Sequence, residues 1–241
     1  SALLKSNIIV SKQNDKGILE KIKKSLSLNR SKKIFFNDSY SYCAVENNFF
    51  YYEDEYGALK LPMPNLMGNF QLSNVTTAIA TLRSIGELKI TDKNIKEGIT
   101  KIKNTNGRLQ EIKSGKLKSI VKKNKLFVDG SHNPLGAKVL VDYLDTIHSK
   151  KHIIIGMMSN KQHNEYINLF RNKIESLTTV DIPNQPNSIK GIELKKKING
   201  FNKINYKSSI KEALKSLILE DEDIVLITGS LYLAGEVLNL N

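Results

Sequence analysis

KLFVDGSHNPLGAKVLVDYLDTIHSKKHIIIGMM, residues 125–158, is the stretch that decides the fold. A short apolar run is followed by an amphipathic segment that begins at Asn133-Pro134 and then by a second apolar run at 152–157. Asn is a favoured N-cap and Pro a favoured first helical residue, so the middle segment predicts a helix through residue 148. Two short apolar strands joined by a helix predict a right-handed βαβ unit with parallel strands.

The same alternation continues to the end of the chain. It predicts a doubly wound, mostly parallel α/β domain of the Rossmann type, with helices on both faces of the sheet. The further strands expected are 177–182, 204–206 and 224–228, and the further helices are 163–172, 188–198, 210–219 and 231–238.

The first part of the chain has a different pattern. Aromatic and β-branched residues over 40–62, interrupted by turn residues, predict a small antiparallel meander. The polar segment 103–107 has no apolar periodicity, so we expect two domains, residues 1–106 and 107–241. The other elements expected in the first domain are strands at 8–11 and 33–36 and helices at 15–28, 70–85 and 91–102.

Composition narrows the class of protein. The chain has 241 residues, 40% of them hydrophobic and 25% charged, with no apolar run long enough to span a membrane. A single cysteine argues against a disulfide framework and indicates a reducing, cytoplasmic location. The net charge is +13, yet four of the 37 basic residues are arginines and the remaining 33 are lysines spread along the chain. Because nucleic-acid recognition relies on arginine and on focused basic patches, we do not expect a nucleic-acid partner.

Ligands of open parallel sheets bind beyond the carboxyl ends of the strands, and polar residues follow several predicted strands. Asp129 ends one strand and His132 precedes the next helix, where a carboxylate can hold a ribose hydroxyl and an imidazole can face phosphate. The start of a helix is enough to explain Asn133 and Pro134, but it does not explain the carboxylate and the imidazole beside them. Arg108, near the boundary, suits a phosphate contact or an interdomain salt bridge.

Other residues have weaker signals. Lys161 in the first turn of a helix opposes the dipole and so suggests an anionic ligand, although in a lysine-rich chain it can be incidental. Ser230, expected to be exposed after a glycine turn, can line a ligand. A tight turn with a glycine at positive φ is also a sufficient explanation of this motif. Asn74, near a helix start, has an amide able to contact an adenine edge, although such a residue often only faces solvent.

Further residues are expected to be structural. Ser114-Gly115 is interpreted as a hairpin turn and Cys43 as a buried apolar residue, and three histidines as surface or loop residues: His148, His152 and His163. Neither the phosphate-binding loop G-x-x-x-x-G-K-[ST] nor the dinucleotide motif G-x-G-x-x-G after a strand occurs in the sequence.

Five motifs occur in a recognisable order: GNFQLSNVTTA (68–78), NGRLQ (106–110), VDGSHNP (128–134), GMMSNK (156–161) and TGSLYLAGEV (228–237). Together they resemble the folylpolyglutamate synthases, many of which are also dihydrofolate synthases, in the Mur ligase superfamily. The resemblance implies the end of a central ATPase domain followed by a glutamate-ligase domain. It also implies ATP-dependent addition of L-glutamate to a folate or dihydropteroate carboxylate through an acyl phosphate.

The resemblance also implies roles for single residues. Asn74 would contact adenine, Arg108 the ATP phosphates and Asp129 the ribose, and His132 would lie near the terminal phosphate, so that Arg108 and His132 are the catalytic candidates. Lys161 and Ser230 would lie on the glutamate side of the cleft.

The resemblance further implies ATP and Mg²⁺ as cofactors and a monomeric enzyme. The phosphate-binding loop, most Mg²⁺ ligands and much of the pterin pocket would lie upstream of Ser1, so we expect a fragment that is inactive alone. Two alternatives remain open: another Mur-superfamily amino-acid ligase, and a non-catalytic nucleotide-binding fragment.

Overall fold

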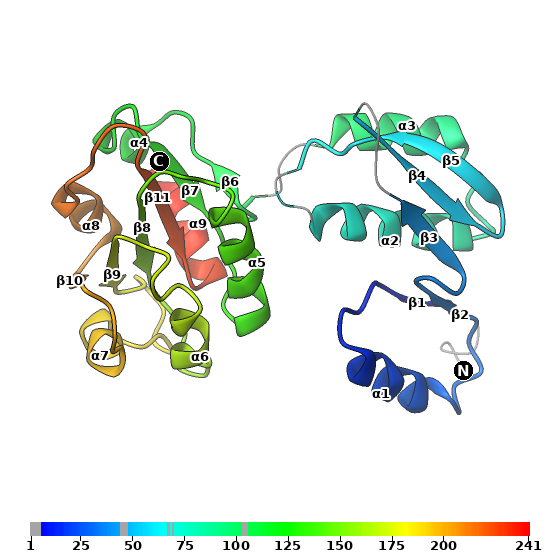
Figure 1. The fold of residues 1–241 in the computed structure, drawn as a ribbon, viewed down its shortest axis with the longest axis horizontal. Coiled ribbons are helices and arrows are strands. Elements are labelled where there is room, and N and C mark those ends of the chain that lie inside the picture. The colour runs from blue at the N-terminus through cyan, green and yellow to red at the C-terminus, as the bar shows by residue number, and fades with distance from the viewer. Residues whose placement is uncertain (1–5, 44–47, 67, 69, 103–105) are drawn as a thin grey trace. The chain divides into compact units, whose positions relative to one another are not determined.

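A computed structural model of the chain describes residues 6–43, 48–66, 68, 70–102 and 106–241 (Figure 1). Two compact units make up the chain, and they are called unit 1 (residues 1–103) and unit 2 (residues 104–241). The expected boundary segment lies partly outside the described residues, at 103–105, and the division at 106/107 stays a prediction. None of the helices in the described ranges is both long and apolar enough to cross a membrane.

Unit 1 contains two small sheets. Strands β1 (Ile8–Val10) and β2 (Lys33–Phe35) pair in parallel, and α1 (Lys16–Leu26) lies between them in the sequence. Strands β3 (Tyr40–Cys43), β4 (Phe49–Asp54) and β5 (Gly57–Pro62) form the predicted antiparallel meander. Successive side chains of a strand point to opposite faces, and along β4 it is Phe50 and Tyr52 that are buried.

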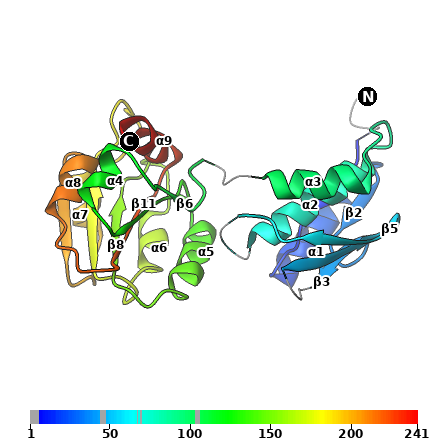
Figure 2. The same cartoon turned by 90° about the horizontal axis from the view of Figure 1, so that it is seen from above.

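Two helices complete the core of unit 1. Figure 2 shows helices α2 (Phe70–Ser84) and α3 (Asp92–Lys101) beside the strands of unit 1. The helices contribute Leu72, Val75 and Ile95 to the same buried cluster as the meander. Thr91 caps α3 as expected, because its hydroxyl accepts from the Asn94 amide while the Asn94 side chain accepts from the Thr91 amide.

Unit 2 is built on one six-stranded sheet in the order β10-β9-β8-β11-β7-β6. The five strands from β10 to β7 are parallel, and β6 pairs with β7 in the antiparallel sense. This confirms the predicted Rossmann-like, mostly parallel sheet. The strands are β6 (Gln110–Glu111), β7 (Lys125–Val128), β8 (Lys151–Ile155), β9 (Ser176–Val180), β10 (Ile204–Lys207) and β11 (Ile224–Thr228).

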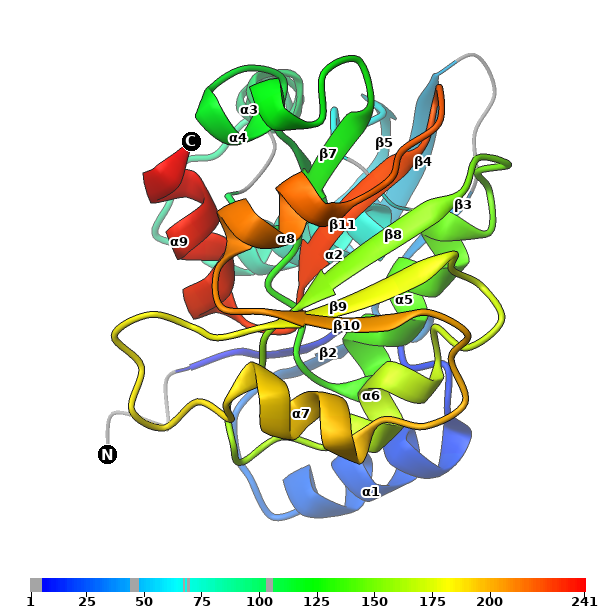
Figure 3. The same ribbon diagram turned by 90° about the vertical axis from the view of Figure 1, so that its left-hand side faces the viewer.

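Helices cover both faces of this sheet (Figure 3). One face packs on α4 (Lys116–Ile120), α8 (Ile210–Ser216) and α9 (Leu231–Leu240), and their apolar residues join those of the strands in one core cluster. The other face carries α5 (Pro134–Leu144), α6 (His163–Asn168) and α7 (Gly191–Lys197). The domain is therefore doubly wound, as the alternation of strands and helices predicts.

Two elements of unit 2 were missed, and one interpretation is wrong. The sequence did not predict β6 or α4. Gly115 is not a hairpin turn but the N-cap of α4, with φ of +109°. The side-chain oxygen of Asn241 accepts hydrogen bonds from the amides of Leu117 (3.1 Å) and Lys118 (3.3 Å), so the chain end completes this short helix.

Several single-residue expectations are also wrong. Cys43 is exposed, not buried. His152 is 3% exposed, and its ring lies 2.8 Å from Ser176 Oγ and 3.2 Å from Asp223 Oδ2. His163 is buried as well, with Nε2 2.9 Å from the Met158 carbonyl. Both histidines have polar partners inside unit 2: two side chains bond the ring nitrogens of His152, and a carbonyl five residues earlier bonds Nε2 of His163.

Candidate functional site

The parallel strands β7, β8, β9 and β11 end at the same edge of the sheet, where α/β proteins bind ligands. The segments that follow them are 129–133, 156–162, 181–190 and 229–230. Hydrogen bonds hold these segments together: Gly229 N donates to Ser131 O (3.1 Å), and Gly156 N donates to the carbonyl of Thr228 at the end of β11 (3.3 Å). The candidate site is this carboxyl edge of unit 2.

Asp129 is the anchor of the edge. Its side chain is buried, and Oδ1 accepts from Ser131 N while Oδ2 accepts from Leu109 N, both at 2.7 Å. Backbone N–H groups bonded to a carboxylate are charge-assisted hydrogen bonds, roughly twice as strong as neutral ones. Asp129 therefore fastens the 107–109 segment to its own loop.

Arg108 lies in that fastened segment. The residues on either side of it have left-handed backbones, Gly107 with φ of +66° and Leu109 with φ of +44°. Gly107 O accepts from Gly130 N at 2.8 Å, and Leu109 is buried. A left-handed backbone is uncommon for leucine, so the buried contacts and the bond to Asp129 have to hold it. Arg108 itself is exposed.

His132 is the second functional side chain of the loop. It is half-buried, and its Nδ1 lies 3.1 Å from the carbonyl oxygen of Gly130. A carbonyl can only accept, so Nδ1 carries the hydrogen and Nε2 is the nitrogen left to accept or release a proton. The next residue, Asn133, caps α5 through a hydrogen bond from Gly136 N (2.9 Å), with Pro134 at the first helical position, as predicted. The structure thus brings the segments of Arg108, Asp129 and His132 together.

Lys161 and Ser230 differ from expectation. Ser230 is 2% exposed rather than exposed, because its hydroxyl oxygen caps α9 by accepting from Tyr232 N at 3.1 Å. Lys161 is half-buried and lies outside α6, which begins at His163, so the argument from the first helical turn is wrong. Both residues still lie in segments at the carboxyl edge.

Asn74 belongs to unit 1, whereas the other five candidate residues belong to unit 2. It is exposed on α2, and its amide nitrogen donates to Gln71 Oε1 at 3.1 Å. This bond fixes which way the amide of Asn74 points. Two residues before the helix, Met67 and Asn69, lie outside the described residues.

Sequence reasoning missed three hydroxyl groups at the edge, those of Ser131, Tyr166 and Thr228. Tyr166 OH lies 2.8 Å from both Ser131 Oγ and Thr228 Oγ1. Burial raises the pKa of Tyr166 well above its usual range, so the phenol stays protonated. The sequence did not indicate a role for the Tyr166 hydroxyl, because a tyrosine on the apolar stripe of a helix has the pattern of an ordinary core residue.

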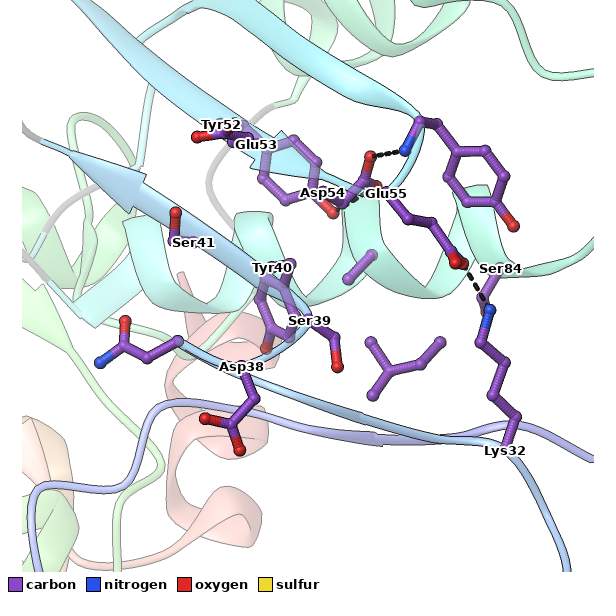
Figure 4. Close-up of a pocket in the computed structure, with 14 residues that line it drawn as sticks. Lys32, Asp38, Ser39, Tyr40, Ser41, Tyr52, Glu53, Asp54, Glu55 and Ser84 are labelled. Carbon is purple, nitrogen blue, oxygen red and sulfur yellow. Dashed lines mark hydrogen bonds and ion pairs between the residues drawn. The ribbon is translucent and has the colours of Figure 1, made fainter.

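A pocket of about 490 Å³ lies in unit 1, and five of its polar residues bond one another (Figure 4). Lys32 pairs with Glu55, and Asp54 accepts from Tyr56 N (2.9 Å) and from Tyr52 OH (2.9 Å). Burial, with the bond to Asp54, raises the pKa of Tyr52. Since these groups already have partners, the carboxyl edge of unit 2 is the stronger candidate.

Side chains that could bind a metal ion are scattered in the described part of the chain. The described residues hold no cluster of three or more His, Cys, Asp or Glu side chains able to bind a metal ion. The carboxyl edge offers one buried carboxylate, Asp129, and both of its oxygens already accept from backbone amides. The described residues therefore do not fit a protein-made Mg²⁺ site.

The fold and the site define an α/β protein with an anchored loop system at the carboxyl edge of a doubly wound sheet. The sequence profile of the Mur ligase glutamate ligase domain matches residues 107–231. This chain belongs to the Mur ligase family.

Relatives agree with this assignment. The folylpolyglutamate synthase of Lacticaseibacillus casei is 28% identical over 193 residues, which cover 78% of this chain and 42% of that protein. The resemblance seen in the motifs is thereby confirmed, and the chain is a folylpolyglutamate synthase-like member of its family.

Solved structures share the fold. E. coli FolC in complex with DHPP and ADP matches with a TM-score of 0.77 and 19% identity over 98% of this chain and 53% of that one. The folylpolyglutamate synthase of Thermotoga maritima matches with a TM-score of 0.71 and 22% identity over 96% and 53%. The chain spans about half the length of the relatives it matches.

Proposed function

We propose that this chain carries the glutamate-ligase part of an ATP-dependent ligase that adds L-glutamate to the carboxylate of a folate or a dihydropteroate. The observation that supports this most directly is the loop anchored by Asp129, which presents Arg108 and His132 at the carboxyl edge. The loop lies inside the segment matched by the glutamate ligase profile.

In such a ligation ATP supplies a phosphoryl group to the carboxylate, and the amine of glutamate then displaces phosphate from the acyl phosphate. The exposed guanidinium of Arg108 offers paired donors to phosphate oxygens. His132, held through Nδ1, can donate from Nε2 to a phosphoryl oxygen when protonated. The backbone segments that carry the two groups are fastened to each other at the same edge of the sheet.

The remaining candidates take binding roles in this proposal. Each oxygen of Asp129 holds one backbone N–H and keeps a lone pair that can accept from a ribose hydroxyl. Asn74 offers its amide to adenine, and Lys161 offers its ammonium to a carboxylate of glutamate. Ser230 accepts from Tyr232 N as the cap of α9 and keeps its hydroxyl hydrogen to donate to a ligand.

No step of the proposal passes through Mg²⁺, because the described residues hold no cluster of three or more metal-ligating side chains. The sequence also has no phosphate-binding loop of the G-x-x-x-x-G-K-[ST] type. We therefore expect the 241-residue chain by itself to bind ligands at the carboxyl edge without turnover.

The test is a titration of the ¹⁵N-labelled chain with ADP and, separately, with L-glutamate, followed by amide NMR. Ligand-dependent shifts are expected at Arg108 and over 129–132. Arg108→Ala should weaken ADP binding, whereas Arg30→Ala, which removes another exposed arginine, should not. Shifts confined to other parts of the chain, or equal dissociation constants for the two variants, would contradict the proposal.

An activity assay of the whole enzyme separates two of the alternatives: a folate ligase turns over pteroate or a folate, and another Mur-superfamily ligase turns over a nucleotide-sugar precursor. The spectra test the third alternative. A nucleotide-binding protein without ligase chemistry predicts a response to ADP and none to L-glutamate.

A further inference from the structure

Three hydroxyl groups form a closed ring at the carboxyl edge of unit 2. Tyr166 OH lies 2.8 Å from Ser131 Oγ and 2.8 Å from Thr228 Oγ1, and these two oxygens lie 3.3 Å apart. Each hydroxyl can donate once and accept once around such a ring, so all three are satisfied. Tyr166 and Thr228 are buried, and the residues come from α6, the end of β11 and the loop after β7.

Ser131 is the residue through which this ring reaches the candidate site. Its amide donates to Asp129 Oδ1 at 2.7 Å, and its carbonyl accepts from Gly229 N at 3.1 Å. With its hydroxyl in the ring, Ser131 is held at each of its polar atoms. Its neighbour in the chain is His132, whose ring is fixed through Nδ1 to Gly130 O. A displacement of Ser131 therefore moves the backbone that orients His132.

We infer that Tyr166 is a positioning residue, whose hydroxyl sets the orientation of the His132 ring by holding Ser131 in place. The importance of this for ligand binding rests on the proposed function, but the effect on His132 does not. Burial raises the pKa of Tyr166, so its hydroxyl remains a donor throughout the neutral pH range. The tyrosine ring also packs against Phe170, with ring centres 5.6 Å apart, and this contact does not need the hydroxyl.

Tyr166→Phe is the direct test because it removes one oxygen and keeps the ring. It leaves Ser131 and Thr228 with a single long contact and one hydroxyl without a donor. Tyr206→Phe is the matched control, since it also deletes a tyrosine hydroxyl of unit 2, one that donates to Asp181 Oδ2 at 3.0 Å.

The readout is the pair of imidazole ¹⁵N chemical shifts of His132 at fixed pH, which report the tautomer and are assigned with a His132→Gln variant. Loss of one buried hydrogen bond, about 1 kcal/mol, corresponds to about a fivefold change in an equilibrium. We expect the ratio of the Nδ1–H to the Nε2–H form to fall about fivefold in Tyr166→Phe and to stay at the wild-type value in Tyr206→Phe.

A purely structural role would lower the stability of unit 2 without moving these shifts, and wild-type shifts in Tyr166→Phe would overturn the inference. The route through Ser131 is tested by a double-mutant cycle: in a Ser131→Ala background, Tyr166→Phe should have no further effect on His132. Additive effects would overturn that route.

Binding of ADP to the same variants separates this inference from the proposed function. If the wild-type chain does not bind ADP, the proposed function fails, and the shifts of His132 still decide the role of Tyr166. If it does bind, Tyr166→Phe should weaken ADP about fivefold relative to Tyr206→Phe.

Discussion

Replacing Asp129 by asparagine tests whether one carboxylate fastens the candidate site. Asparagine has nearly the same shape but a single acceptor oxygen, and its NH₂ group would face a backbone N–H. Either Leu109 N or Ser131 N, both now 2.7 Å from a carboxylate oxygen, therefore loses its acceptor.

The magnitude follows from the geometry. A hydrogen bond to a charged group contributes about 1.5–3 kcal/mol, and with its side chain 5% exposed Asp129 is hardly screened by solvent. Losing one of the two bonds should cost about 2 kcal/mol, which corresponds to about a thirtyfold change in the local opening equilibrium. Local opening should increase most at Leu109, because its left-handed backbone at φ of +44° relaxes when the hydrogen bond is lost.

Native-state amide hydrogen exchange, read by NMR, measures this opening residue by residue. The amide that loses its acceptor, that of Leu109 or that of Ser131, should exchange about thirtyfold faster in Asp129→Asn than in the wild type. Asp142→Asn is the control, because Asp142 is exposed on α5 and loses the same charge. If the two variants exchange at the same rate at both amides, the anchoring role of Asp129 is refuted.

Three further predictions concern stability. Gly229→Ala should lower the melting temperature by the equivalent of about 2 kcal/mol or more, because the backbone has φ of +106° and the new Cβ would lie 2.7 Å from Gly156 O. Gly235→Ala is the control: the new Cβ would meet open space in α9, so the melting temperature should rise. Thr178→Val should stabilise unit 2 by about 1 kcal/mol in urea unfolding, because Thr178 Oγ1 is buried and has no hydrogen-bond partner among the described residues. A loss of stability would contradict this. The raised pKa values of Tyr52 and Tyr166 contribute stability that is present below the pKa of an unfolded tyrosine, about 10, and is lost as the pH rises above that value. Absorbance at 295 nm should show these two tyrosines ionising at higher pH than an ordinary tyrosine. A single normal transition for all nine tyrosines of the chain would disprove the prediction.

Local signals in the sequence predicted most of the fold. The apolar run at Ile224–Thr228 forms β11 with the predicted bounds, and Thr91 and Pro134 mark helix starts as expected. Such signals work because an N-cap or a buried strand is decided by neighbouring residues.

What escaped prediction depends on contacts between distant residues. Helix α4 has five residues and is completed by Asn241, which lies 124 residues after Leu117. His152 is inside the protein because its partners Ser176 and Asp223 come from other segments of unit 2. No pattern near a residue can show a partner of this kind, so burial of a polar residue was the least predictable property.

The same limit applies to the candidate site. Motif positions indicated Arg108, Asp129 and His132, but they did not show that Asp129 holds the amides of Leu109 and Ser131. They also placed Ser230 at the surface, where the structure has it capping α9 from within.

The double engagement of Asp129 restricts how this protein can change over evolutionary time. A residue that only touched a ligand could drift when the ligand changed, but substitution of Asp129 also releases the segment that carries Arg108. Arg108 is held in the fold through its backbone and His132 through one ring nitrogen, so the outer atoms of both side chains are free to vary. A lineage that loses nucleotide binding should therefore diverge first at the outer atoms of Arg108 and His132 and keep the aspartate.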